Sequence, residues 1–106
     1  MLKKTKSTAE KFVQYIGILS EDRRLNVWHL AILISIMQLG YNQRQKNVIK
    51  VSRSRIMALS HVNTLPTYHK YFKELQNFGY IIYSPSYHLG YQSEVKLTIK
   101  ARKAGF

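Results

Sequence analysis

Apolar residues recur at helical spacing in the first part of the chain. Between Thr8 and Leu19 they stand four and three residues apart, which predicts a helix with one apolar stripe. From Asn26 to Gly40 they cover most of a helix circumference, and we predict that Asn26 caps this helix and that Gly40 ends it. Such a helix is expected to be the central core helix or part of a contact between subunits, and the two roles are compatible.

The pattern then changes to a short strand followed by two closely spaced helices. Val48 to Val51 is rich in β-branched residues and is predicted to pair as a strand. Ser52 is expected to cap the short helix that follows it, in which the apolar side chains face the core while Arg53 and Arg55 point elsewhere. A tight connection then leads to the next helix.

This next helix divides its side chains between two faces. Asn63 or Thr64 is expected to cap it, and Gly79 to end it. Large apolar side chains at i, i+4 and i+7 are predicted to be buried: Tyr68, Phe72 and Leu75. The opposite face carries small polar and cationic side chains: Thr67, Lys70, Lys73 and Asn77. Such a face suits the major groove of DNA, where short polar side chains reach base edges and lysines reach phosphates.

Residues 80–100 have the pattern of a β-hairpin with a long tip. A strand follows Gly79, a turn-rich loop contains Pro85 and Gly90, and in the second strand polar residues alternate with Val95, Leu97 and Ile99. The tip offers four side chains for contact with a nucleic-acid backbone or minor groove: Tyr87, His88, Tyr91 and Gln92. The alternative is an ordinary hairpin tip whose tyrosines pack on the sheet.

The charge balance narrows the choice of partner. Seventeen Lys and Arg against five Asp and Glu give a formal net charge of +12, which favours nucleic acid first and an anionic membrane surface second. The longest apolar run is shorter than the roughly twenty residues of a membrane span, so no membrane-spanning helix is expected, and nucleic acid rather than a membrane is the expected partner. All 106 residues are expected to form one domain, with flexible basic tails at 1–7 and 101–106. The absence of Cys fits a reducing compartment, so a cytoplasmic location is expected, and a DNA-binding role would associate the protein with the nucleoid.

The residue pattern predicts no catalysis, no metal and no cofactor. The histidines have neither an i, i+4 pair nor a Cys partner: His29, His61, His69 and His88. The five acidic residues form no obvious acid and base pair, and Glu74 is expected to pair with Lys70 one helical turn away. The eight tyrosines are expected to serve mainly in the core and at its rim rather than in base stacking.

The order of elements from Asn26 to Ile99 resembles the winged helix-turn-helix superfamily of DNA-binding proteins. The most specific part is SRSRIMALSHVNTLPTYHKYFKELQNFGYI, which is similar to the family's first helix, tight turn, recognition helix and glycine before the hairpin. The resemblance implies an α+β fold with an extra N-terminal helix and a C-terminal β-hairpin wing. It implies that Thr64 to Phe78 is the recognition helix and that Ser84 to Ser93 is the wing.

Two sets of side chains then carry the expected contacts with double-stranded DNA. Hydrogen bonds to bases or backbone are assigned to Asn63, Thr64 and Thr67. Phosphate contacts are assigned to Arg53, Arg55, Lys70 and Lys73, although for the two arginines the alternative is a role in solubility alone. The recognition face departs from the family pattern because it is poor in Arg and because Leu65 stands at an exposed early position, which suits a thymine methyl group.

More narrowly, the segments VWHLAIL, KVSRSRIMALSHV and LPTYHKYFKEL resemble small winged-helix proteins of bacterial conjugative transposons. This implies an excision accessory factor beside an integrase or other recombinase, or a transcriptional regulator of a mobile element, acting as a homodimer or as a cooperative array on DNA. One alternative is a protein–protein interaction module that docks a recombinase or another DNA-bound partner. A third hypothesis is an RNA-binding protein.

Overall fold

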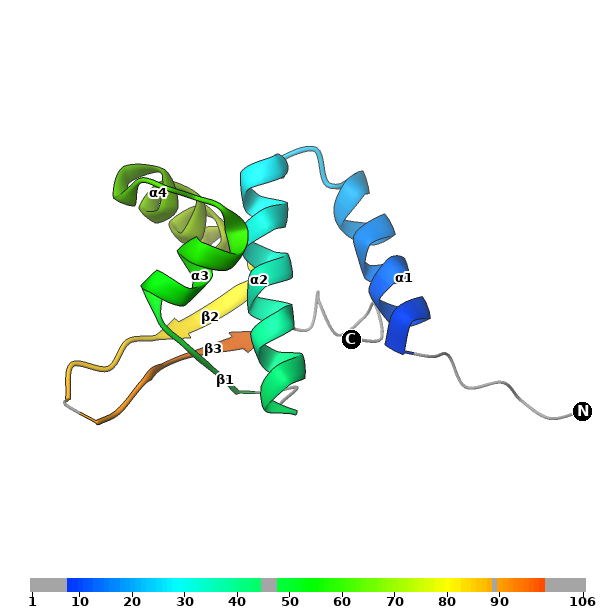
Figure 1. Cartoon of the computed structure of the whole chain (residues 1–106). Helices are drawn as coiled ribbons and strands as arrows, with labels where there is room; N and C mark the ends of the chain where they lie inside the picture. Colours follow the sequence, from blue (N-terminus) through cyan, green and yellow to red (C-terminus); the bar gives the residue numbers. More distant parts are fainter. Residues whose placement is uncertain (1–7, 45–47, 89, 99–106) are drawn as a thin grey trace, which may run out of the picture.

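The computed structural model describes residues 8–44, 48–88 and 90–98, which form four helices and one three-stranded antiparallel sheet (Figure 1). The elements are, in chain order, α1 (Thr8–Glu21), α2 (Val27–Gln43), β1 (Ile49–Val51), α3 (Arg53–Ser60), α4 (Leu65–Asn77), β2 (Ile81–Ser84) and β3 (Ser93–Leu97). The expected α+β class is confirmed, and the element order is compatible with a winged helix. The predictions for the two tails and for Ile99 lie outside the described residues.

The sheet places β3 between the two other strands. Its order is β1-β3-β2, and both pairings are antiparallel. Val95 lies opposite Ile49 on one side and opposite Tyr83 on the other, so one residue at the middle of β3 sets the register of both neighbours. Val95 is completely buried, which holds this register because a shift by one residue would turn its side chain out of the core.

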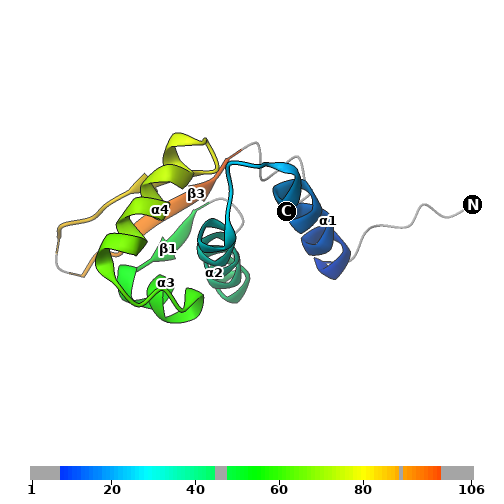
Figure 2. The same cartoon turned by 90° about the horizontal axis from the view of Figure 1, so that it is seen from above.

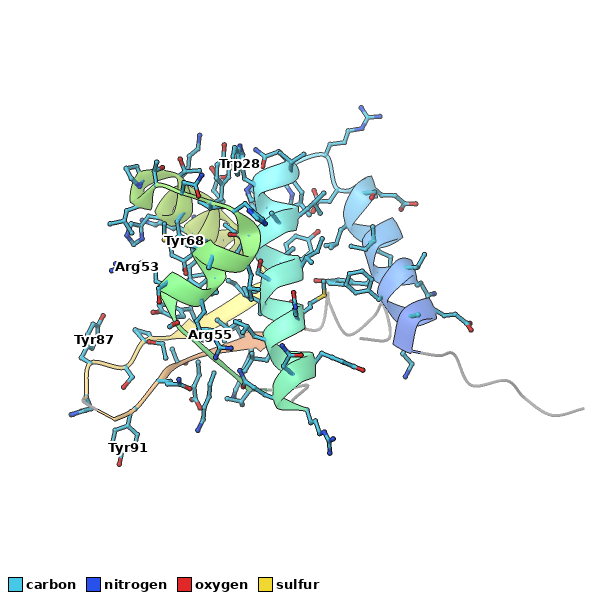
Figure 3. The ribbon with its side chains drawn as sticks, in the orientation of Figure 1. Trp28, Arg53, Arg55, Tyr68, Tyr87 and Tyr91 are labelled. Atoms are coloured by element: carbon cyan, nitrogen blue, oxygen red, sulfur yellow. The ribbon has the colours of Figure 1, made fainter. Side chains whose placement is uncertain are left out.

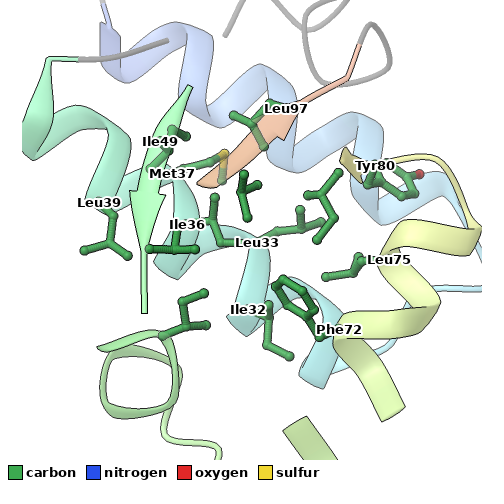
Figure 4. Packing of buried hydrophobic residues seen from close by; sticks show 14 of the residues in the cluster. Ile32, Leu33, Ile36, Met37, Leu39, Ile49, Phe72, Leu75, Tyr80 and Leu97 are labelled. Atoms are coloured by element: carbon green, nitrogen blue, oxygen red, sulfur yellow. The ribbon is translucent and has the colours of Figure 1, made fainter. Parts of the chain in front are cut away.

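Helix α2 forms the centre of the molecule. In the view of Figure 2 it lies between α1 on one side and α3, α4 and the sheet on the other. Its side chains Ile32, Leu33 and Ile36 are fully buried, and they pack with β1, α4 and β3 in one continuous core (Figure 4). The prediction of a central core helix is therefore confirmed. Within the described ranges, no helix combines the length and apolar character needed to cross a membrane.

The predicted end of α2 at Gly40 is wrong, because the helix continues to Gln43. Gly40 is buried within the helix, and the left-handed conformation falls on Arg44, with φ of 55°. The cause is a tertiary contact beyond the reach of a local pattern. The Gln43 side-chain amide donates to the Lys50 carbonyl at 2.7 Å and accepts from the Lys50 N–H at 2.9 Å, which holds the last turn of α2 against β1.

The first turn of α2 is tied to α4 through one buried histidine. Asn26 caps the helix as predicted, since its side chain accepts from the N–H groups of Trp28 and His29. In return, the Asn26 N–H donates to Nδ1 of His29 at 2.9 Å, so that nitrogen carries no proton. The other ring nitrogen, Nε2, then donates to Oε1 of Glu74 at 2.7 Å. The predicted pairing of Glu74 with Lys70 is therefore wrong, because the Glu74 carboxylate lies against α2.

A second polar contact ties the loop after α1 to the start of the hairpin. Asp22 accepts a hydrogen bond from the Tyr80 hydroxyl at 2.5 Å and two from the Arg24 guanidinium, at 2.8 and 3.0 Å. The hydrogen bonds from Arg24 and Tyr80 hold the pKa of the Asp22 carboxyl well below its usual range. Burial, followed by the bond to Asp22, raises the pKa of Tyr80 to about 12.

The His29 bridge predicts a large effect on stability. Replacing His29 by Ala should lower the free energy of unfolding by about 3 kcal/mol. The substitution removes a buried ring, the hydrogen bond that its Nδ1 accepts from the Asn26 N–H, and its hydrogen bond to Glu74. Urea denaturation measures the change. The matched control is His69→Ala, because His69 is exposed on α4 and its loss should change stability by less than about 0.5 kcal/mol. Equal effects of the two substitutions would contradict the bridge.

The Asp22 cluster predicts a pH dependence. Because the pKa of Asp22 is lower in the folded state, its contribution is fully present above the unfolded pKa of about 4 and is lost as the pH falls below it. Asp22→Asn should therefore destabilise the protein by about 1 kcal/mol at pH 6 and should reduce the loss of stability seen below pH 4. Urea denaturation across this pH range tests both effects, with exposed Glu21→Gln as the control.

Candidate nucleic-acid interface

The turn between α3 and α4 sets the start of the helix that carries most of the predicted site. His61 takes the left-handed conformation at the end of α3, with φ of 62°. Thr64 is the N-cap residue of α4, as one of the two predicted alternatives, but its side chain makes no capping hydrogen bond. Its hydroxyl instead donates to that of Thr67 at 2.8 Å. Pro66 lies in the first turn, where its missing N–H is harmless.

The two faces of α4 largely agree with the predicted pattern. Tyr68, Phe72 and Leu75 are buried as expected, and Gly79 follows the helix with φ of +85°. The exposed face carries His69, Lys70, Lys73 and Asn77, together with Asn63 and Leu65 near its start. Thr67 departs from the prediction because it is only half-exposed. The centre of the exposed face is therefore shifted toward His69, which stands one turn before Lys73.

An open groove lies between the start of α3, α4, the sheet and residues 85–88 and 90–92, which we call the hairpin loop. Its rim includes Arg53 and Ser54 from α3, His69 from α4, and Tyr91 and Gln92 from the hairpin loop. Its floor includes two stacked aromatic rings, Tyr68 and Phe72, whose centroids lie 5.2 Å apart. None of the described residues that line the groove is acidic. The groove thus brings together residues of α3, α4 and the hairpin loop, and Arg53 is the one Lys or Arg in its described lining.

The floor of the groove presents a neutral phenol to this cation. Burial raises the pKa of Tyr68 above its usual range, the nearby Tyr83 hydroxyl raises it further, and Arg53 acts in the opposite direction. Phe72 packs edge-to-face on Tyr83 with a centroid separation of 5.0 Å, so the aromatic floor continues onto β2. The Tyr68 hydroxyl therefore stays protonated at neutral pH, so no phenolate in the groove neutralises the positive charge of Arg53.

The two predicted arginines of α3 belong to different hollows. Arg53 lines the groove described above, whereas Arg55 lines a second hollow together with Gln43, Lys50 and Gln92 (Figure 3). Both arginines are exposed. Gln92 lines both hollows, so the base of the hairpin loop forms a ridge between two cationic sites.

The tip of the hairpin loop projects into solvent. Tyr87 is 91% exposed and Tyr91 is 75% exposed, and the His88 ring meets Tyr91 edge-on with a centroid separation of 6.3 Å. The alternative in which these tyrosines pack on the sheet is therefore wrong. Among the predicted residues, the four of the hairpin loop, the two arginines of α3 and the face of α4 lie on neighbouring elements.

Sequence reasoning missed three side chains of this region. His69 lines the groove, Tyr83 contributes to its floor, and Lys50 lies beside Arg55. The spacing between His69 and Lys73 signalled a shared face and could have identified the first. Lys50 and Tyr83 reach the site only because β1 and β2 both pair with β3, which no local signal indicates.

The distribution of acidic residues adds to the positive character of this surface. Between residues 51 and 93 the chain has one acidic residue, Glu74, and its carboxylate is bound to His29. The same segment contains four Lys and Arg: Arg53, Arg55, Lys70 and Lys73. Within the described part of the chain, no three His, Cys, Asp or Glu side chains gather where they could hold a metal ion.

No protein-family model, curated protein or solved structure matches this chain.

The groove predicts that Arg53 contributes more to polyanion binding than an arginine elsewhere. Arg53→Ala should lower the salt concentration that elutes the protein from heparin, because a cation at a site without acidic neighbours is lost. Arg23→Ala is the matched control, since Arg23 is also exposed but lies in the loop between α1 and α2. Equal shifts for the two variants would show that only total charge matters.

Proposed function

We propose that this protein binds double-stranded DNA through the exposed face of α4, the start of α3 and the hairpin loop. The observation that carries the proposal is the groove in which Arg53, His69 and Gln92, from three different elements, come together without an acidic neighbour. DNA binding requires cations to neutralise phosphates and polar side chains on an element that fits a groove. The net charge of +12 supports the same partner.

The side chains divide into two proposed roles. Lys70, Lys73, Arg53 and Arg55 contact phosphates and supply affinity that depends on salt. Asn63, Thr64 and His69 contact base edges or the sugar-phosphate backbone near the start of α4. Thr67 has a smaller role than its sequence position indicates, because it is half-exposed and already accepts a hydrogen bond from Thr64.

The narrower role rests on the resemblance of the sequence alone. An excision accessory factor that works beside a recombinase, and a transcriptional regulator of a mobile element, both need a small basic domain that recognises duplex DNA. The two roles differ in where the preferred site lies, which is beside a recombination site for the first and beside a promoter for the second. A selected DNA motif therefore separates them.

A protein-interaction module is the second candidate, and one observation favours it. Val27 is 71% exposed and Trp28 is 39% exposed at the start of α2, and Trp28 stacks on Tyr71 of α4 with a centroid separation of 6.2 Å. This apolar and aromatic surface lies beside the proposed DNA-binding face of α4. A DNA-bound recombinase could occupy it without competing for the groove.

The proposed division of roles predicts different effects of two neighbouring substitutions. Lys73→Ala should weaken binding to all duplexes by about tenfold or less and should reduce the salt slope by about one, because one phosphate contact is lost. His69→Ala should instead change the order of preference among sequences. Selection from a random duplex library, followed by salt-titrated binding of the recovered motif, measures both.

The control for this experiment is Lys96→Ala, because Lys96 is exposed on β3 and outside the proposed interface. Recovery of no motif, with binding lost at physiological salt for every variant alike, would contradict the proposed function and favour the interaction module. Preference for a single-stranded competitor would favour an RNA-binding protein instead.

A further inference from the structure

Exposure separates the eight tyrosines of the chain into three groups. Tyr15, Tyr68 and Tyr80 are buried, and Tyr71 and Tyr83 pack against the core. The exposed tyrosines are Tyr41 on α2 and the pair on the hairpin loop, Tyr87 and Tyr91. The sequence expectation that tyrosines serve the core and its rim therefore holds for five of them, and it fails for Tyr41 and for the pair on the hairpin loop.

The rings of this pair lie on opposite sides of one narrow element. In Figure 3, Tyr87 and Tyr91 point away from each other at the end of the hairpin loop, the part of the described structure farthest from α1. The edge-on contact with His88 gives Tyr91 a neighbour within the hairpin loop. The tip is therefore a thin projection with an aromatic surface on each side.

The chemistry of the tip differs from that of its base. Residues 84–93 contain no Lys and no Arg, whereas Arg53 lines the groove beside Tyr91, and Lys50, together with its cross-strand partner Glu94, lines a hollow on the other side of the hairpin loop. Cations suit phosphates, and exposed aromatic rings suit the flat faces of bases. The cations at the base of the hairpin loop are thus placed to contact the phosphates of the DNA strands on either side of it. The tip suits contact with the bases between those strands.

Base faces are covered by stacking in an uninterrupted duplex. They become accessible where a step is unstacked, as at a bulge, a nick or a branch, and wedge-like side chains act on DNA at such steps. We propose, building on the DNA-binding function proposed above, that the tip of the hairpin loop is a wedge that stacks Tyr87 and Tyr91 on the faces of an unstacked base step. The protein then binds interrupted DNA more tightly than continuous duplex.

The test compares two DNA probes of the same sequence, one a continuous duplex and one with an adenine bulge, by fluorescence anisotropy at matched salt. The wild-type protein should bind the bulged probe about tenfold more tightly, from the stacking of one or two bases. The double variant Tyr87→Ala with Tyr91→Ala should lose this preference, so that its affinities for the bulged probe and for the continuous duplex become equal within about threefold. The double Phe variant should keep the preference, because the ring stacks and the hydroxyl does not.

The outcomes separate the two proposals. Equal binding of both probes by the wild type would overturn the wedge and leave duplex binding intact, whereas binding of neither probe at low salt would overturn the proposed function itself. Loss of the preference in the Phe variant would overturn stacking in favour of a hydroxyl contact. Tyr41→Ala is the matched control, because Tyr41 is 68% exposed on α2, and loss of the preference in this variant would also overturn the wedge. Thermal melting of each variant confirms that the fold is retained.

Discussion

The burial of α2 on several sides is the constraint on which the rest of the structure depends. A helix that is apolar around most of its circumference must be covered, and here α3, α4 and β1 all pack on it. Each fully buried Leu or Ile contributes about 2 kcal/mol relative to an exposed one, so Ile32, Leu33 and Ile36 act as a strong common anchor. The groove is shaped by elements held in this way, and its own polar side chains need to contribute little to the fold.

The local patterns of the sequence were sufficient for most of the fold. The stripe in α1, the caps at Asn26 and Ser52, and the two faces of α4 all depend on neighbours within one or two turns, and all agree with the structure except that Thr67 is only half-exposed. Two of the errors share a different cause. Gly40 does not end α2, and Glu74 does not pair with Lys70, because Lys50 on β1 and His29 on α2 supply partners from other elements.

The candidate site could be predicted residue by residue more easily than as an arrangement. Charge and residue type drew attention to Arg53 and Arg55, but their separation by the ridge at Gln92 follows from how α3 meets the hairpin. Tyrosine is an ambiguous residue in the same way, since its ring serves equally well in a core and on a surface. Only the burial of Tyr68 and the exposure of Tyr87 assign the two rings to different roles.

The side chain of Gln43 has a consequence for how copies of this chain meet. β1 pairs with β3 along one side only, so its other side would present a backbone N–H and a carbonyl to any passing strand. At Lys50 both groups are already bound by the Gln43 amide, which imitates the hydrogen bonds that an added strand would make. At Lys50 this edge of the sheet therefore has no free backbone group left for a strand of a second copy.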